Sequence, residues 1–152
     1  MAPVSAPVLI LYATVSGNAE ELAHAAATEL GARGRELVVE NAADFAVARL
    51  REFAVALVIA STWGEGEPPP DAAEFWAALA APELRLETLR YAVLALGSSS
   101  YRDFCGAGRV LDERLAARGA RRLLPRRDCD TKFKTDFKEW LHEVEGALDA
   151  QT

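Results

Sequence analysis

Three things that the sequence lacks narrow its function before any motif is considered. No apolar run approaches the ~20 residues that a membrane-spanning helix needs, so we expect no transmembrane segment and no membrane partner. The 152 residues hold two cysteines, Cys105 and Cys129, and neither has a cysteine or histidine at metal-ligand spacing. We therefore expect no metal site and reduced thiols. The net charge of −6 argues against nucleic acid as a main partner.

The beginning of the chain also lacks the pattern of an export signal. Residues 1–7 contain no basic segment followed by an apolar one, so the expected location is cytoplasmic. Hydrophobic residues make up 51% of the chain and charged residues 26%, and no repeat or linker divides it. We expect residues 1–152 to form one domain, with residues 1–6 as a disordered lead-in.

Charge is distributed unevenly along the chain. Residues 118–138 contain eight basic residues and only three aspartates, whereas residues 63–84 contain five acids and no basic residue. Two interpretations stay open: two solvated faces, or an acidic docking surface that steers a basic protein partner. The five acids of this acidic surface are Glu65, Glu67, Asp71, Glu74 and Glu83.

The hydrophobic pattern alternates between strands and helices. Continuous apolar runs at 8–13 and 54–61 are typical of strands buried on both faces. This alternation predicts an α/β fold, a doubly wound five-stranded parallel sheet of order 2-1-3-4-5 in a three-layer sandwich. The other expected elements are strands at 36–40, 91–96 and 122–124, a short helix at 44–51, and amphipathic helices at 18–30, around 72–79, at 110–118 and at 133–148.

The loop after the first strand has the chemistry of an anion site without a cation. Residues 13–20 contain hydroxyl-bearing and small residues but no lysine or arginine, and a helix follows at once. Backbone N–H groups, hydroxyls and the positive end of the helix dipole suit a phosphate group. The lysine-containing loop that holds nucleotide triphosphates is absent.

Two later loops each carry one large aromatic residue among glycine, proline and small polar residues. Trp63 follows the third strand and Tyr101 follows the fourth, and both loops meet the first one at the carboxyl edge of the predicted sheet. A flat ring fits between two such aromatics. Gly64, Gly66 and Gly97 let the backbone approach the edge of that ring. Phosphate at one loop and a planar ring at two others describe a flavin mononucleotide (FMN) site.

Other reactive residue types have simpler interpretations. Trp76 and Trp140 lie on apolar helical faces and are expected in the core. His24 and His142 lack a partner acid and nucleophile, so we expect no catalytic residue among them. Cys105 is expected to be small buried packing that offers its backbone N–H, with a redox thiol as the alternative.

Three motifs in the expected order carry a resemblance to a known family. They are TVSGNAE at 14–20, STWGEGEP at 61–68 and LGSSSYRDFC at 96–105, with RDCD at 127–130 in support. From about residue 8 to 148 the chain resembles the flavodoxin family, and more narrowly the FMN domain of diflavin reductases such as the sulfite reductase flavoprotein.

The resemblance implies a cofactor, FMN, and a set of residues that bind it. Trp63 and Tyr101 would sandwich the ring, and Asp130 matches an acid close to the ring. The phosphate would be held by Thr14, Val15, Ser16, Gly17, Asn18 and Ala19. The polar edge of the ring would meet backbone at Thr62, Gly64, Gly97 and Cys105, and the matched motifs add Ser61, Leu96, Ser98 and Phe104.

The chain departs from the family pattern at two positions. Ser98 stands where aspartate or asparagine is frequent, which removes a negative charge beside the ring. Val15 stands where a polar residue is frequent, although only its backbone N–H is needed. No long insertion splits the fifth strand, so the resemblance is to the short-chain form.

The functional prediction is a monomeric FMN protein that shuttles single electrons between a reductase and an acceptor protein, docked on the acidic surface. One alternative is an FMN domain excised from a diflavin reductase. A second is a flavin-dependent enzyme such as a quinone reductase, but no G-x-G-x-x-G nicotinamide fingerprint follows a strand. A third is a non-redox interaction module of the same fold, although the acidic cluster that a receiver domain needs after its first strand is absent.

Overall fold

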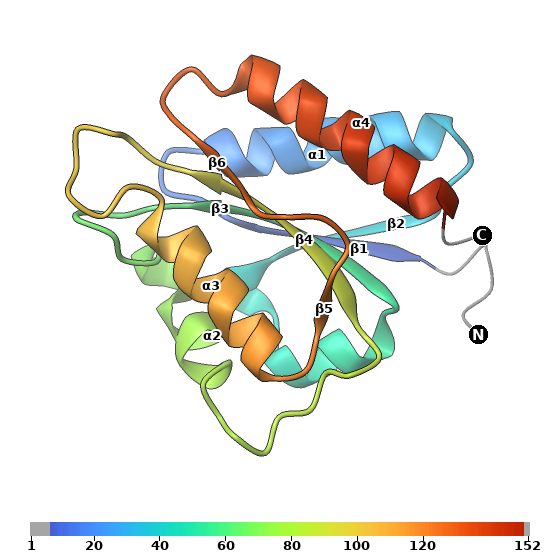
Figure 1. The fold of residues 1–152 in the computed structure, drawn as a ribbon, viewed down its shortest axis with the longest axis horizontal. Coiled ribbons are helices and arrows are strands. Elements are labelled where there is room, and N and C mark those ends of the chain that lie inside the picture. The colour runs from blue at the N-terminus through green and yellow to red at the C-terminus, as the bar shows by residue number, and fades with distance from the viewer. Residues whose placement is uncertain (1–6, 151–152) are drawn as a thin grey trace.

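The computed structural model describes residues 7–150, so the expected lead-in at residues 1–6 lies outside the described residues. A parallel sheet forms the middle layer of three (Figure 1). Its strands are β1 (Val8–Ala13), β2 (Leu37–Asn41), β3 (Val55–Ser61), β4 (Arg90–Leu96), β5 (Arg121–Arg122) and β6 (Arg127–Cys129). The α-helices of the described part are α1 (Asn18–Ala32), α2 (Ala73–Ala78), α3 (Gly106–Ala117) and α4 (Lys134–Ala150).

The strand order confirms the predicted doubly wound sheet. Neighbouring strands follow the order β2-β1-β3-β4-β5, every pairing between these strands is parallel, and β6 also pairs with β4. Helices α1 and α4 cover one face of the sheet, and α2 and α3 cover the other (Figure 1). The chain reverses its winding direction between β1 and β3, which is the position where such sheets bind ligands.

Two predicted elements differ in the structure. The short helix expected at 44–51 is a pair of 3-10 turns, η1 (Ala42–Asp44) and η2 (Val47–Glu52). The Asn41 side chain accepts a hydrogen bond from the Ala43 N–H at 2.9 Å, which starts the first turn two residues early. A third 3-10 turn, η3 (Pro70–Ala72), leads into α2.

The fifth strand, expected at 122–124, is two short strands separated by a break. β5 ends at Arg122, and the Leu123 N–H donates to the Tyr91 carbonyl at 2.6 Å. Pro125 has no N–H to continue the ladder, so the chain leaves the sheet there. Pairing resumes at β6, where Arg127 lies opposite Leu94 and Cys129 opposite Leu96. This second piece brings its following residues to the same edge as the loops after β1, β3 and β4.

Each face of the sheet has its own hydrophobic core. The buried Trp140 packs between the sheet and α4, and the buried Trp76 packs on the opposite face, so both tryptophans are core residues as predicted. Trp76 also donates its indole N–H to the Ala107 carbonyl at 2.9 Å. No helix in the described part of the chain is long and apolar enough to cross a membrane.

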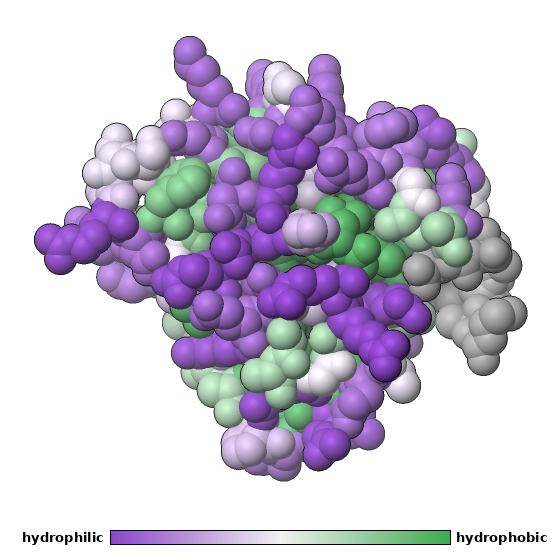
Figure 2. Space-filling model, viewed as in Figure 1, coloured by the Kyte–Doolittle hydropathy of each residue, from purple (hydrophilic) through white to green (hydrophobic). Residues whose placement is uncertain are grey.

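Hydrophilic side chains predominate on the face shown in Figure 2, where hydrophobic residues appear as small separate patches. Across residues 7–150 the exposed large hydrophobic residues are Val15, Trp63 and Tyr101. One lies in each of the loops after β1, β3 and β4. Exposed apolar side chains that gather at a ligand-binding edge point to a binding function rather than to packing.

Candidate functional site

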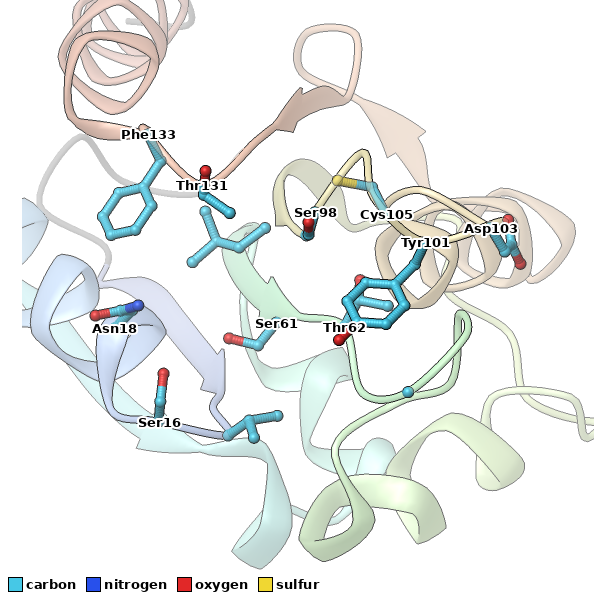
Figure 3. Close-up of a pocket in the computed structure, with 14 residues that line it drawn as sticks. Ser16, Asn18, Ser61, Thr62, Ser98, Tyr101, Asp103, Cys105, Thr131 and Phe133 are labelled. Carbon is cyan, nitrogen blue, oxygen red and sulfur yellow. The ribbon is translucent and has the colours of Figure 1, made fainter.

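A pocket of about 240 Å³ opens at the carboxyl edge of the sheet, between the loops that follow β1, β3, β4 and β6 (Figure 3). It is the place where the strand order predicts a ligand. The pocket is lined by Val15, Ser16, Asn18, Ser61, Thr62, Gly64, Leu96, Gly97, Ser98, Tyr101, Asp103, Cys105, Thr131 and Phe133.

The structure brings most of the predicted site residues to this pocket. From the loops after β1, β3 and β4, it places Val15, Ser16, Asn18, Ser61, Thr62, Gly64, Leu96, Gly97, Ser98, Tyr101 and Cys105 in the lining. Six others lie around the pocket without lining it: Thr14, Gly17, Ala19, Trp63, Phe104 and Asp130. Ala19 is fully buried in the first turn of α1.

Sequence reasoning missed three lining residues: Asp103, Thr131 and Phe133. Asp103 stood inside a recognised loop but had no role assigned to it. Thr131 and Phe133 follow β6, a strand of three residues that periodicity does not reveal. The signal available was the parallel rule: once residues 127–129 are recognised as a strand beside β4, the residues after them must lie at the carboxyl edge.

The loop after β1 is shaped to present N–H groups. The Thr14 hydroxyl oxygen accepts a hydrogen bond from the Gly17 N–H at 2.9 Å, which closes the loop. Gly17 takes a positive φ of 95° at the N-cap, and the first helical bond runs from the Glu21 N–H to the Gly17 carbonyl at 3.0 Å. The N–H groups of the first turn before Glu21 have no acceptor within the helix. Side chains of Ser16 and Asn18 border the space above them (Figure 3).

The loop after β3 is a tight hairpin. The Trp63 N–H donates to the Glu67 carbonyl at 2.7 Å, and the Glu67 N–H donates back to the Trp63 carbonyl at 2.8 Å. Gly64 turns the chain with a φ of 55°. Trp63 is 46% exposed and Tyr101, on the loop after β4, is 51% exposed. Both aromatics are therefore available to a planar ligand.

A buried hydroxyl inside the pocket has no partner. The Thr62 Oγ1 atom is buried and has no hydrogen-bond partner among residues 7–150, although Thr62 lines the pocket. An unsatisfied buried hydroxyl costs about 1–3 kcal/mol, which a polar ligand atom at this position would recover. Asp103 is the one charged residue in the lining, and no lysine or arginine belongs to it.

Both cysteines are buried, and Cys105 belongs to the pocket lining. Burial raises the pKa of the Cys105 thiol to about 12, and burial also raises that of Cys129 to about 12. The Cys105 Sγ atom lies 3.5 Å from the Ala95 carbonyl oxygen and 3.6 Å from that of Cys129. A thiol that stays protonated is a poor nucleophile. The geometry therefore favours the packing interpretation of Cys105.

Asp130 ties the loop after β6 to the loop after β4. Its carboxylate accepts hydrogen bonds from the Ser99 hydroxyl, from the Ser99 N–H at 3.1 Å and from the Thr131 N–H at 2.8 Å. These hydrogen bonds lower the pKa of Asp130, the Ser99 hydroxyl contributing most. Its negative charge thus sits beside the pocket, held by the loop rather than aimed into it.

No group of histidine, cysteine, aspartate and glutamate side chains within residues 7–150 is arranged to hold a metal ion. The neutral donors of the first loop suit a phosphate monoester, and the orphaned Thr62 hydroxyl and the exposed aromatics suit a polar, planar ring. The residues present therefore fit a flavin nucleotide.

Comparison with known proteins finds a matching family and several similar sequences. The model of the flavodoxin family matches residues 10–141. The sulfite reductase [NADPH] flavoprotein alpha-component of Bacillus subtilis is 42% identical over 144 residues, covering 93% of this chain and 24% of that protein. The corresponding protein of Shewanella sp. strain ANA-3 is 39% identical over 94% of this chain and 24% of its own length. The chain thus spans about a quarter of these curated relatives.

Solved structures agree over almost the whole chain. A flavodoxin from Streptococcus pneumonia TIGR4 superposes with a TM-score of 0.84 at 27% identity, covering 97% of this chain and 100% of its own. A flavodoxin from Pseudomonas aeruginosa, solved as a cysteine-to-alanine mutant, gives a TM-score of 0.81 at 33% identity, with 94% and 99% covered.

Proposed function

This chain belongs to the flavodoxin family, and on that premise we propose that it binds FMN and carries single electrons between a reductase and an acceptor protein. When bound, FMN supplies a ring that takes up and releases electrons. The observation that carries the proposal is the pocket at the carboxyl edge, which is lined by neutral N–H and hydroxyl donors and by the exposed Tyr101. The exposed Trp63 lies between the lining residues Thr62 and Gly64.

The loop after β1 holds the phosphate. Its free helical N–H groups and the hydroxyls of Thr14 and Ser16 donate to the phosphate oxygens, and the α1 dipole favours the negative charge. The bond from the Gly17 N–H to Thr14 keeps the loop in this shape. The residues proposed for this role are Thr14, Val15, Ser16, Gly17, Asn18 and Ala19.

The loops after β3 and β4 hold the ring and keep water from it. Trp63 and Tyr101 pack against its two faces, and the Thr62 hydroxyl gains the partner that it lacks. Backbone at Gly64, Gly97 and Cys105 meets the polar edge. Further contacts are proposed for Ser61, Leu96, Ser98 and Phe104, with the fixed charge of Asp130 nearby.

The acidic surface is the proposed docking site for a basic redox partner. All five of its acids are exposed, and Glu65 and Glu67 stand in the same hairpin as Trp63. A partner held there would meet the aromatic rim of the pocket. We further propose that the chain acts as one domain, as a monomer, in the cytoplasm.

A second candidate is the FMN domain of a longer diflavin reductase. The observation that favours it is the match of this chain to about a quarter of each sulfite reductase flavoprotein. In that setting the donor would be another domain of the same polypeptide. A transcript that continues in frame into a reductase domain would establish this candidate.

Titration of the purified chain with FMN and with riboflavin tests the flavin site. Because riboflavin lacks the phosphate, we expect it to bind roughly 100-fold more weakly, the loss of several charge-assisted hydrogen bonds. Stepwise reduction of the FMN complex should show two separate one-electron stages in the absorption spectrum. Failure to quench FMN fluorescence would reject the site, and a single two-electron stage would reject the carrier role.

A further inference from the structure

We propose that Asp103 is a positioning residue that clasps the loop after β3 to the loop after β4 and thereby sets the spacing of Trp63 and Tyr101. The inference rests on the proposed flavin site and deepens it, since it assigns how the two ring-binding loops are held together. Asp103 was one of the lining residues without a role.

The backbone of Asp103 joins both loops. Its N–H donates to the Glu65 carbonyl at 3.2 Å, and Glu65 lies in the hairpin between Trp63 and Glu67. Its carbonyl accepts from the Gly106 N–H at 3.0 Å, at the first residue of α3. One residue, two positions beyond Tyr101, is thus bonded to the hairpin that carries Trp63.

The side chain of Asp103 fills a slot that only glycines allow. A Cβ atom at Gly66 would lie 2.6 Å from the Asp103 Cβ and Oδ2 atoms. A Cβ atom at Gly106 would lie 2.5 Å from the same Oδ2 atom and 2.8 Å from the Gly66 carbonyl oxygen. Hairpin, carboxylate and helix start are therefore packed at van der Waals contact, with no space to slide past one another.

Arg109 fixes the carboxylate from the helix. Its Nη2 atom lies 3.0 Å from the Asp103 Oδ1 atom and 2.9 Å from Oδ2, and its backbone N–H is bonded within α3 to the Cys105 carbonyl at 3.0 Å. Both partners are more than a third exposed, and pairs of this kind add little to global stability. We expect the Asp103–Arg109 pair to fix the position of the loops after β3 and β4 instead.

The usual reason for an aspartate near the start of a helix is missing here. An aspartate often caps the first N–H groups, but the N-cap of α3 is Cys105 and makes no side-chain cap. The carboxylate is turned toward Arg109 and the hairpin. Asp103 also lies beyond Tyr101 from Ser16 and Asn18 (Figure 3), so the clasp should act on the ring and leave the phosphate loop unchanged.

The test uses Asp103→Asn, which keeps the shape of the side chain, and Arg109→Ala, with Arg109→Lys as the conservative variant. The matched control is Glu87→Gln, which removes the exposed Arg85–Glu87 pair (2.7 Å) outside the pocket. Affinities for FMN and riboflavin are measured, together with amide hydrogen exchange at Trp63, Glu67 and Asp103 in the flavin-free protein.

We expect Asp103→Asn and Arg109→Ala each to weaken the binding of FMN and of riboflavin by the same factor of about ten. This is the effect expected for the loss of one charge-assisted contact. The ratio of FMN to riboflavin affinity should stay that of the wild type, because the phosphate loop is unchanged. Exchange at the three amides should accelerate while that of β1 and β3 does not. Arg109→Lys should recover part of the affinity, and Glu87→Gln should match the wild type.

Unchanged riboflavin affinity, with or without faster exchange, would overturn the positioning role. A changed ratio of the two affinities would also overturn it, since the effect would then reach the phosphate loop. If the wild type bound neither flavin, the proposed function would fail, whereas the exchange measurements in the flavin-free protein would still decide whether Asp103 clasps the two loops.

Discussion

Burial, rather than position along the chain, decides the chemistry of single residues at this site. Cys105 and Cys129 are fully buried at the carboxyl edge of the sheet, and burial raises the pKa of each thiol to about 12. Ser98 lines the pocket, where its hydroxyl oxygen accepts from the Ser100 N–H at 3.2 Å. Burial therefore keeps both thiols protonated and unreactive. A charged side chain introduced at Ser98 would instead lie in the pocket lining, next to a bound ligand.

Both thiols should resist alkylation in the native protein. Raising a thiol pKa from about 8.5 to about 12 lowers the reactive thiolate roughly a thousandfold near neutral pH. Iodoacetamide labelling followed by mass spectrometry measures the rate, with the protein in concentrated guanidinium chloride as the control. Equal rates in the two conditions would contradict the prediction.

The same burial predicts a loss of stability at alkaline pH. The folded thiols keep their protons to a higher pH than the unfolded ones do, so their contribution is complete below about pH 8.5. It is lost as the pH rises from there toward about 12, because the unfolded thiols ionise first. The urea concentration at the midpoint of unfolding should fall less steeply with rising pH for Cys105→Ala than for the wild type.

Ser98→Asp should make the bound flavin harder to reduce. A carboxylate in the pocket lining disfavours the negative charge of the reduced ring, which lowers the potential of the second electron by on the order of tens of millivolts. A redox titration of the FMN complex measures the shift. Ser98→Asn is the uncharged control of similar size, and an equal shift in both variants would exclude a charge effect.

Among the elements, α3 packs closely against β4 at a glycine. A Cβ atom at Gly108 would lie 2.3 Å from the Ala95 Cβ and 3.2 Å from its Cα. The absence of a side chain on α3 therefore lets the helix sit on the strand. Since Cys105 and Gly106 begin the same helix, this contact also determines where the loop after β4 returns to the pocket.

Gly108→Ala should destabilise the protein by about 1–3 kcal/mol through overpacking, and Ala95→Gly in the same chain should recover part of that loss. Gly146→Ala in α4 is the control, because nothing lies within 4 Å of its added Cβ. That substitution should stabilise by up to about 1 kcal/mol. Urea unfolding measures these three variants and the single Ala95→Gly variant, and additive effects of Gly108→Ala and Ala95→Gly would rule out the contact as the cause.

Strands that are buried on both faces could be predicted from their apolar runs. A short strand that is defined only by its pairing with a neighbouring strand could not. The apolar run at 8–13 coincides with β1, and the runs at 54–61 and 91–96 match β3 and β4 to within one residue. β6 consists of Arg127, Asp128 and Cys129, and its pairing with β4 defines it. The same difficulty affected the site. The loops after the long strands were predicted to bind the ligand, whereas Thr131 and Phe133, which follow β6, were missed.

Over the whole molecule, acidic and basic residues are exposed in different segments of the chain. Part of the basic run of 118–138 is neutralised, since Arg122 and Arg126 pair with the buried Asp112 and Arg127 pairs with Asp136. The lysines of the chain, Lys132, Lys134 and Lys138, are all exposed. The five acids of the acidic surface are exposed in the hairpin after β3, in η3 and α2, and in the segment between α2 and β4. An uneven distribution of exposed charge of this kind would orient a charged partner as it approaches.

Electron transfer to a basic acceptor should slow as salt is added. Raising ionic strength from about 0.01 M to about 0.15 M shortens the Debye length from about 30 Å to about 8 Å, so the rate should fall several-fold. Glu65→Gln with Glu67→Gln should remove part of this dependence. Stopped-flow mixing of the reduced protein with cytochrome c, a basic haem protein, gives the rates.

Glu36→Gln with Glu87→Gln is the matched control, since it removes the same charge just before β2 and β4, at the amino edge of the sheet. This pair of substitutions should leave the salt dependence close to that of the wild type. Rates independent of salt in the wild type would reject electrostatic docking on the acidic surface.

The late position of Thr131 and Phe133 in the pocket lining has a consequence for biosynthesis. A nascent chain that has left the ribosome only as far as α3 has three of the four loops but lacks the residues that follow β6. Partly synthesised chains should therefore capture flavin poorly. Cofactor uptake then reports that the last strand has joined the sheet, so a flavin-loaded chain is one that has finished folding.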